Sequence, residues 1–384
     1  GSGSSSLGMS ASSSNLSEGT SSGDGCGDGA STPGTFCFKK LDFLTLTSPH
    51  AAVGGPLHGE VQASFVVVTL LTDEVTTIEH DGGNLLQGAP VKLVHNSERQ
   101  LRLANFGGSA FPEVVVTSVI GLSGWLANND GVIGPYEDFM LQDSNGIGRL
   151  FPIDIDGDGL SEVIKGRDDI ARLWIKIGEQ WMPQGPSFAV DGCKVLWDAA
   201  VGDFNNDGLD DIAFIGSTSS WDSGTECDPI PAMKIRVLLA TGKPDLLKES
   251  ALIPTGQASE QIVTGDFDGD KLLDLAVASG LDEGVIALRG LGDGQFAQPL
   301  SVVPDGKRVL VGDFDGDGVQ ELATNRYTTD ALVAQVWIVD SVLSSASLHQ
   351  ILDLNAALLA SADINGDGID DMAMKSVGPS GSHF

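Results

Sequence analysis

The chain of 384 residues has few basic residues, few aromatic residues and no long apolar run. Its 21 Lys and Arg residues stand against 53 Asp and Glu residues, which gives a formal net charge of −32. A chain this acidic is not expected to bind nucleic acid through its phosphates, and an anionic lipid surface would repel it. Because no run of 18 apolar residues occurs, we also expect no membrane-spanning helix.

The usual signatures of enzymes are missing as well. The six histidines are scattered, and the chain contains no His-Glu-x-x-His pair and no Gly-Lys-Ser/Thr phosphate loop. Acidic residues are abundant, but nearly all acid pairs belong to the repeated loops described below. The sequence therefore favours a binding role, and it leaves open an enzyme that uses two further carboxylates.

Cysteine is sparse, with four residues at Cys26, Cys37, Cys193 and Cys227. An even, low count is typical of a secreted or periplasmic protein with two disulfides, for which three connectivities exist. We favour the sequence-local pairs, Cys26 with Cys37 and Cys193 with Cys227; buried free thiols are the alternative. The chain has no signal peptide and starts Gly-Ser-Gly-Ser-Ser-Ser, so we expect that an export signal was removed.

The first 35 residues differ in composition from the rest of the chain. Residues 1–35 are rich in Ser, Gly, Thr and Asp, and they are expected to form a flexible tether because they offer little apolar surface to bury. From Phe36 onward, short apolar or alternating segments are separated by Gly, Asp and Asn turns, without a long capped helix. Residues 36–384 therefore read as a single all-β domain.

Five nine-residue segments of this domain are close copies of one another. Each carries a carboxylate or amide side chain at positions 1, 3, 5 and 9, and most have glycine at positions 4 and 6. The copies are Asp154-Ile-Asp-Gly-Asp-Gly-Leu-Ser-Glu162, Asp203-Phe-Asn-Asn-Asp-Gly-Leu-Asp-Asp211, Asp266-Phe-Asp-Gly-Asp-Lys-Leu-Leu-Asp274, Asp313-Phe-Asp-Gly-Asp-Gly-Val-Gln-Glu321 and Asp363-Ile-Asn-Gly-Asp-Gly-Ile-Asp-Asp371.

Hard oxygen ligands at this spacing, without histidine or thiolate, favour calcium over zinc, copper or magnesium. The acid at position 9 and the flanking strands exclude an EF-hand, which needs a bidentate Glu at position 12 between helices. Simple Asp-Gly hairpin turns are the alternative. With side chains at positions 1, 3, 5 and 9 and the backbone carbonyl at position 7, the predicted ligands are Asp154, Asp156, Asp158, Leu160, Glu162, Asp203, Asn205, Asp207, Leu209, Asp211, Asp266, Asp268, Asp270, Leu272, Asp274, Asp313, Asp315, Asp317, Val319, Glu321, Asp363, Asn365, Asp367, Ile369 and Asp371.

Two further features of the loops can be predicted. The apolar residue at position 2 is expected to pack in the core. Position 6 is expected to need a left-handed backbone, which glycine adopts most easily. Lys271 occupies this position in the third copy. We therefore expect the 266–274 loop to bind calcium most weakly of the five.

The spacing of the copies predicts the architecture. They start at residues 154, 203, 266, 313 and 363, and two degenerate copies precede them at Asn105 and near Gly55. A unit of about 50 residues with four short strands is typical of a β-propeller blade, so we predict a seven-bladed propeller. The last unit lacks strands, and we expect the N-terminal strand at 36–46 to complete it. The remaining strand would come from residues 376–384 or from chain beyond Phe384.

These repeats resemble the FG-GAP family, also called VCBS, which is found in integrin α-subunit propellers and secreted bacterial proteins. The resemblance covers roughly residues 36–384 and rests on the five loops, on the strands that follow them, on Gly292-Asp-Gly-Gln-Phe296 and on Gln87-Gly-Ala-Pro90. It implies a calcium-binding propeller that recognises a glycan or protein. Separately, Cys26-Gly-Asp-Gly and Pro33-Gly-Thr-Phe-Cys37 are similar to segments of myxobacterial surface lipoproteins, which implies an outer-surface location and a lipid tether upstream of residue 1.

The fourth unit is 63 residues long and carries an extra loop that includes Trp221 and Asp222. Long loops on rigid scaffolds often mediate recognition, and a tryptophan face beside polar groups suits a sugar ring. A tryptophan folded back as a lid is the alternative, and Trp125 is a second candidate. We thus expect a secreted adhesion or lectin-like module. The alternatives are a calcium-dependent polysaccharide lyase or glycosidase, and a scaffold whose binding module lies elsewhere.

Overall fold

The computed structural model consists of strands joined by turns and loops. It describes residues 7–12, 38–40, 46, 49–58, 63–69, 71–81, 84–93, 99–107, 111–118, 124–138, 149–167, 170–178, 180–189, 196–216, 233–243, 247–255, 259–279, 284–327, 332–341, 343–354 and 356–376. These ranges contain no helix, which agrees with the all-β prediction. In particular, no helical segment in the described ranges has the length and hydropathy of a membrane span.

The strands form antiparallel meanders in which each strand pairs with the next along the chain. The first sheet contains β3 (Pro49–Gly55), β4 (Ser64–Thr69), β5 (Glu74–His80) and β6 (Leu85–Gln87), with β7 (Val91–Lys92) beside β5. The second sheet contains β8 (Arg99–Ala104), β9 (Glu113–Ser118), β10 (Gly124–Asn129) and β11 (Val132–Asp138). The third sheet contains β12 (Leu150–Ile153), β13 (Glu162–Arg167), β14 (Ile170–Ile177) and β15 (Gln180–Ala189).

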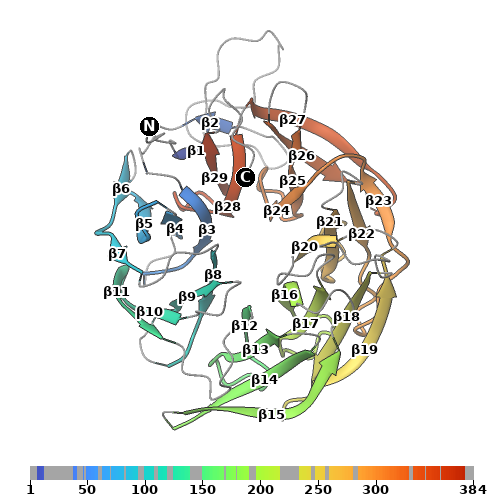
Figure 1. The fold of residues 1–384 in the computed structure, drawn as a ribbon. Helices are drawn as coiled ribbons and strands as arrows, with labels where there is room; N and C mark the ends of the chain where they lie inside the picture. Colours follow the sequence, from blue (N-terminus) through green and yellow to red (C-terminus); the bar gives the residue numbers. More distant parts are fainter. Residues whose placement is uncertain are drawn as a thin grey trace.

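Three further meanders follow in the same order. They are β16 (Leu196–Gly202), β17 (Asp211–Gly216), β18 (Lys234–Ala240), β19 (Leu247–Pro254); β20 (Ser259–Gly265), β21 (Asp274–Ser279), β22 (Val285–Leu288), β23 (Leu300–Val303); and β24 (Arg308–Gly312), β25 (Glu321–Tyr327), β26 (Leu332–Val339), β27 (Ala346–Leu354). The sheets stand around a central axis, with the first strand of each innermost (Figure 1). The fold is therefore a β-propeller.

One further sheet joins the two ends of the chain. Strands β28 (Ala356–Ala362) and β29 (Asp371–Ser376) come from the C-terminal end, and β1 (Leu7–Ser12) and β2 (Phe38–Lys40) come from the N-terminal end. Strand β1 pairs with β29 from Leu7 opposite Lys375 to Ser10 opposite Met372, and β2 pairs with β1. The N-terminal part of the chain thus supplies two strands of this sheet.

This sheet differs in one respect from the sequence expectation. We expected one N-terminal strand from residues 36–46 in the last sheet, and we expected residues 1–35 to form a tether. The structure instead places β1 between β29 and β2, inside the expected tether. Pairing at a sheet edge uses backbone N–H and C=O groups, which a Ser-rich segment supplies as well as any other. The other described part of 1–45 is β2, so a tether in the remainder stays a prediction.

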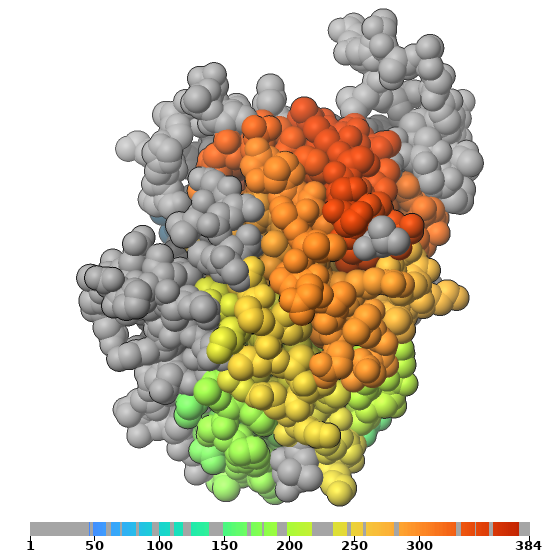
Figure 2. Space-filling view, turned by 90° about the vertical axis from the view of Figure 1, so that its right-hand side faces the viewer, coloured from blue at the N-terminus to red at the C-terminus, as the bar shows by residue number. Residues whose placement is uncertain are grey.

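Apolar clusters fill the spaces between neighbouring sheets, and five of these clusters include the position-2 residue of a repeated loop. Every position-2 residue is buried and packs between its own sheet and the next one, as predicted: Ile155, Phe204, Phe267, Phe314 and Ile364 are 0–3% exposed. Further clusters join the β3 sheet to the β8 sheet and the β8 sheet to the β12 sheet. Figure 2 shows the sheets coloured from green through yellow to orange in continuous contact along one side.

Candidate functional site: a ring of acidic loops

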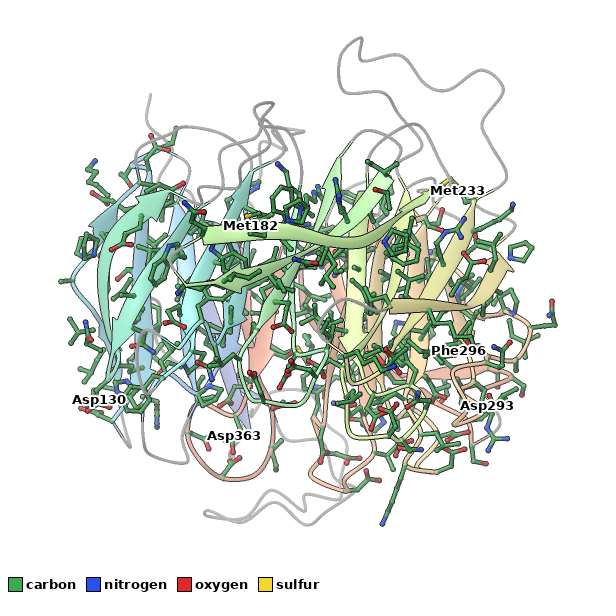
Figure 3. The ribbon with its side chains drawn as sticks, turned by 90° about the horizontal axis from the view of Figure 1, so that it is seen from below. Asp130, Met182, Met233, Asp293, Phe296 and Asp363 are labelled. Atoms are coloured by element: carbon green, nitrogen blue, oxygen red, sulfur yellow. The ribbon has the colours of Figure 1, made fainter. Side chains whose placement is uncertain are left out.

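The five repeated loops connect the innermost strand of a sheet to the second strand. They follow β12, β16, β20, β24 and β28. The innermost strands of these sheets all run in the same direction along the axis. The five loops that follow them therefore lie at one face of the ring. Asp363 marks this face in Figure 3, where Met182 and Met233 lie toward the opposite side.

Each loop has the same backbone conformation. Position 6 is left-handed in all five, with φ of 83°, 86°, 68°, 88° and 86° at Gly159, Gly208, Lys271, Gly318 and Gly368. Position 4 is also left-handed, including Asn206 with φ of 58°. The predicted left-handed turn is therefore confirmed, and Lys271 adopts it despite its side chain, at a conformational cost that glycine avoids.

Side-chain oxygens organise this backbone from inside the loop. In the 313–321 loop, Asp313 Oδ1 accepts a hydrogen bond from the Gly316 N–H at 2.7 Å, and Asp313 Oδ2 accepts one from the Gly318 N–H at 2.9 Å. Asp317 Oδ1 accepts from the Val319 N–H at 2.8 Å. The same bonds recur in the other copies with small variations. The acids thus hold the backbone of the loop in its turn.

The acid at position 9 closes each loop from the second strand. Its carboxylate accepts the N–H of position 2 at 2.8–3.3 Å in all five copies. In three loops, carboxylate oxygens of positions 1, 3 and 9 lie within 4.8 Å of one another: Asp154, Asp156 and Glu162; Asp266, Asp268 and Asp274; Asp313, Asp315 and Glu321. These clusters could hold a metal ion such as Ca²⁺. The other two loops have Asn205 and Asn365 at position 3.

Burial of the position-9 acids changes their protonation. Burial raises the pKa of Glu321 to about 9; the hydrogen bond from the Phe314 N–H opposes this rise, and repulsion by Asp315, Asp313 and Asp317 adds to it. Burial likewise raises the pKa to about 7 in three other loops, at Glu162, Asp211 and Asp274. A divalent ion would reverse this effect because it favours the ionised form.

We predict that calcium uptake releases protons at pH 7 to 8. In the metal-free protein the folded-state pKa values of these acids are raised, so their burial costs stability as the pH rises from about 4.5 to about 9. Calcium binding requires the ionised carboxylates and must expel the protons. Calorimetric titration in buffers of different ionisation enthalpy measures the release. The apparent binding enthalpy should depend on the buffer at pH 7.5, and a buffer-independent enthalpy would contradict the prediction.

Neighbouring loops are also joined to each other, a feature that sequence reasoning missed. The Asp313 N–H donates to Asp370 Oδ2 at 3.0 Å, while the Asp370 N–H donates to the Asp313 carbonyl at 2.8 Å. The same reciprocal pair joins Asp154 to Asp210. Position 8 of one loop thus holds position 1 of the preceding loop. The signal in the sequence is the polar acceptor at position 8, which is Ser161, Asp210, Gln320 and Asp370, with Leu273 as the exception.

The two degenerate copies lack the full set of acids, and the structure describes only part of each. Glu113 is fully buried and accepts the Phe106 N–H at 2.9 Å, as position 9 does elsewhere. In the first copy, His58 pairs through Nε2 with Glu79 at 3.1 Å and through Nδ1 with Asp130 at 3.6 Å. In the first copy, His58 thus links the loop region to Glu79 and Asp130.

The structure describes some of the tryptophans for which a role was predicted, and it leaves others outside the described residues. Trp125 lies in β10, is half-buried and meets Phe106 edge-on, with ring centroids 6.1 Å apart. This packing uses part of the ring, and its role in ligand binding stays a prediction. Trp174 and Trp337 are buried, as predicted for core residues. The remaining candidates lie outside the described residues: Trp221, Asp222, Cys26, Cys37, Cys193 and Cys227.

A cavity of about 310 Å³ opens beside the inner strands β8, β12 and β16. Its lining includes Arg102, Phe151 and Asp210. The guanidinium of Arg102 lies over the Phe151 ring, 5.5 Å from its centroid, and Arg102 Nη2 donates to Asp198 Oδ1 at 2.9 Å. The cavity therefore combines an aromatic face with charged groups, but the ion pair already engages the arginine.

Comparison with known proteins supports the repeat assignment. The model of the FG-GAP-like repeat matches residues 203–277 and 266–324, which contain three of the five loops. A search of curated proteins found no match. The chain therefore carries FG-GAP-like repeats in its central part.

Solved structures with the same fold are distant in sequence. A lectin of Agrocybe aegerita that recognises non-reducing terminal N-acetylglucosamine is 16% identical, with a TM-score of 0.52 over 88% of this chain and 87% of that one. A Bacteroides uniformis protein proposed to be a 6-phosphogluconolactonase is 13% identical, with a TM-score of 0.57 over 91% and 97%. BBS1N in its complex with ARL6DN is 11% identical, with a TM-score of 0.53 over 87% and 93%. At these identities the likeness shows the fold alone: the protein is a β-propeller with FG-GAP-like repeats.

Proposed function

We propose that this protein is a seven-bladed, calcium-binding β-propeller that acts as a non-catalytic recognition module for a glycan or a protein. The observation that carries the proposal is the set of five loops on one face, which share left-handed positions 4 and 6. In three of these loops, carboxylate oxygens of positions 1, 3 and 9 lie within 4.8 Å of one another. Each sheet would be one blade, with β1 and β2 completing the last. The calcium ions would stiffen the loops between the first and second strands of the third to seventh blades.

The proposed ligand sites are all five loops, although in the described residues the clusters of three carboxylates belong to three of them. In the 203 and 363 loops, the amide oxygens of Asn205 and Asn365 would replace one carboxylate each. Amide oxygens are ordinary calcium ligands, so these loops keep the donor chemistry with one negative charge fewer.

A role in recognition is supported by the combination of a rigid ring and a long loop. The loop around Trp221 and Asp222 interrupts the connection between β17 and β18, and insertions of this kind on rigid scaffolds commonly carry binding residues. A lectin shares the fold. We propose a secreted location or one at the outer surface of a bacterium, with a lipid tether upstream of residue 1, and two disulfides between the sequence-local cysteines.

A glycan array probed in millimolar calcium, with a parallel array in EDTA, tests this function. We expect selective binding that is lost in EDTA and weakened by Trp221→Ala, because an aromatic face supplies much of the contact with a sugar ring. Trp125→Ala serves as the second variant. A blank array would exclude the glycan form of the proposal and direct the search to protein partners by crosslinking at the cell surface. Shortened oligosaccharide products would support the alternative of a polysaccharide-degrading enzyme.

A further inference from the structure

The 266–274 loop differs from three of the other loops in the residue that faces it from the third strand of its own sheet. Position 10 pairs with the third strand in each of four sheets: Val163 with Trp174, Ile212 with Leu238, Leu275 with Leu288, and Leu322 with Trp337. The next residue of the third strand therefore lies opposite position 9 and beside the loop. It is apolar in three sheets, as Ile175, Leu239 and Ile338, and it is Arg289 in the fourth.

Arg289 bridges two of the predicted calcium ligands. Its Nε lies 2.7 Å from Asp268 Oδ2, and its Nη2 lies 2.6 Å from Asp270 Oδ2. These carboxylates occupy positions 3 and 5. The Asp268 side chain has no exposed surface, whereas Arg289 is 42% exposed. The guanidinium thus covers the loop from the solvent side and holds together the two acids that an ion would otherwise draw together.

Two basic residues offset half of the negative charge of this loop without an added ion. Four carboxylates, Asp266, Asp268, Asp270 and Asp274, give −4, and Lys271 with Arg289 gives +2, which leaves −2. The 313–321 loop also has four carboxylates, with no cation at position 6 or opposite position 9. One Ca²⁺ would bring that loop to the same −2. Arginine stays charged at any pH at which the protein folds, so its compensation is permanent.

Two other deviations fall on the same loop. Lys271 takes the left-handed position that glycine holds elsewhere, with φ of 68°. Leu273 replaces the polar acceptor at position 8 that joins neighbouring loops in the other copies. This loop therefore keeps its four acids but differs from the other copies at position 6, at position 8 and opposite position 9. These differences indicate that a basic side chain, and not a calcium ion, compensates the charge of its acids.

We propose that Arg289 is the resident cation of the 266–274 loop, and that this loop excludes calcium while the other four loops bind it. This inference rests on the proposed calcium function of the ring, and it narrows the calcium sites from five loops to four. Calcium could enter only by displacing the guanidinium from Asp268 and Asp270, which would break two charge-assisted hydrogen bonds. The β20–β23 sheet would then keep its loop closed at any calcium concentration and provide a fixed element in a calcium-dependent ring.

The test counts bound calcium by equilibrium dialysis with metal analysis of the intact chain, using a pair of exchanged residues. Arg289→Ile places the residue of the next sheet beside the 266 loop, and Ile338→Arg places an arginine beside the 313 loop; Ile338 is 36% exposed, so the arginine has access to solvent. We expect four ions in the unmodified protein, five in Arg289→Ile and three in Ile338→Arg. The melting temperature of Arg289→Ile should also fall further on addition of EDTA than that of the unmodified protein.

The outcomes separate this inference from the proposed function. Five ions in both the unmodified protein and Arg289→Ile would overturn the inference and leave the calcium ring intact. Four ions in both would also overturn it, because the exclusion would then come from Lys271, which Lys271→Gly would reveal by gaining an ion. No bound calcium in any variant would instead remove the proposed function. If Arg289→Ile fails to fold, the loss of one ion in Ile338→Arg still decides the question.

Discussion

Chelation of calcium is expected to lower the melting temperature of this protein markedly. Each loop gathers like charges, with Asp313, Asp315 and Glu321 oxygens within 4.8 Å of one another. Without an ion their repulsion and the burial of Glu321 oppose the folded state. An ion that binds only the folded state adds about 2.7 kcal/mol per site when its concentration is 100 times Kd, and several sites act together.

Differential scanning calorimetry measures the effect in calcium and in excess EDTA. A calcium concentration of about 2 mM is on the order of what saturates such sites. Magnesium at the same concentration is the control, because it needs stricter octahedral geometry and keeps more of its water. Magnesium should restore little of the stability. If the melting curves in calcium and EDTA coincide, structural calcium in this ring is refuted.

Asp313→Ala is expected to destabilise the protein strongly, and the loss should depend on calcium. The carboxylate holds the Gly316 and Gly318 N–H groups and belongs to the cluster with Asp315 and Glu321. Its removal takes away a calcium ligand and the two bonds that shape the turn. We expect a loss of roughly 3 kcal/mol in saturating calcium, mostly from the lost ion. Chemical denaturation in calcium and in EDTA measures it.

Asp305→Ala is the matched control for this substitution. Asp305 lies in a turn of the same region and pairs with Arg326 Nε at 2.7 Å, with both side chains partly exposed. An exposed ion pair of this kind contributes about 0–1 kcal/mol, and its effect should not depend on calcium. The difference in unfolding free energy between Asp313→Ala and Asp305→Ala should therefore be smaller in EDTA than in calcium. Equal losses in calcium would show that Asp313 is not a ligand.

The sequence by itself determined the local parts of the protein. The nine-residue loops, the left-handed position 6 and the buried position 2 were all predicted, because each depends on residues within one short segment. The φ of 68° at Lys271 and the burial of Phe314 agree with those predictions. The period near 50 residues predicted a propeller, since four short strands per unit cannot bury their faces without neighbouring units.

Only the tertiary structure decided how distant segments meet. Pairing of β1 with β29 joins residues near opposite ends of the chain, and the composition of a Ser-rich segment does not reveal such a partner. Asp370 reaches Asp313 from the next repeat. Arg289 reaches Asp268 through the pairing of β21 with β22, about one strand and one turn away in sequence. Periodicity records which residues recur, whereas these contacts depend on strand register and on the packing of one sheet against the next.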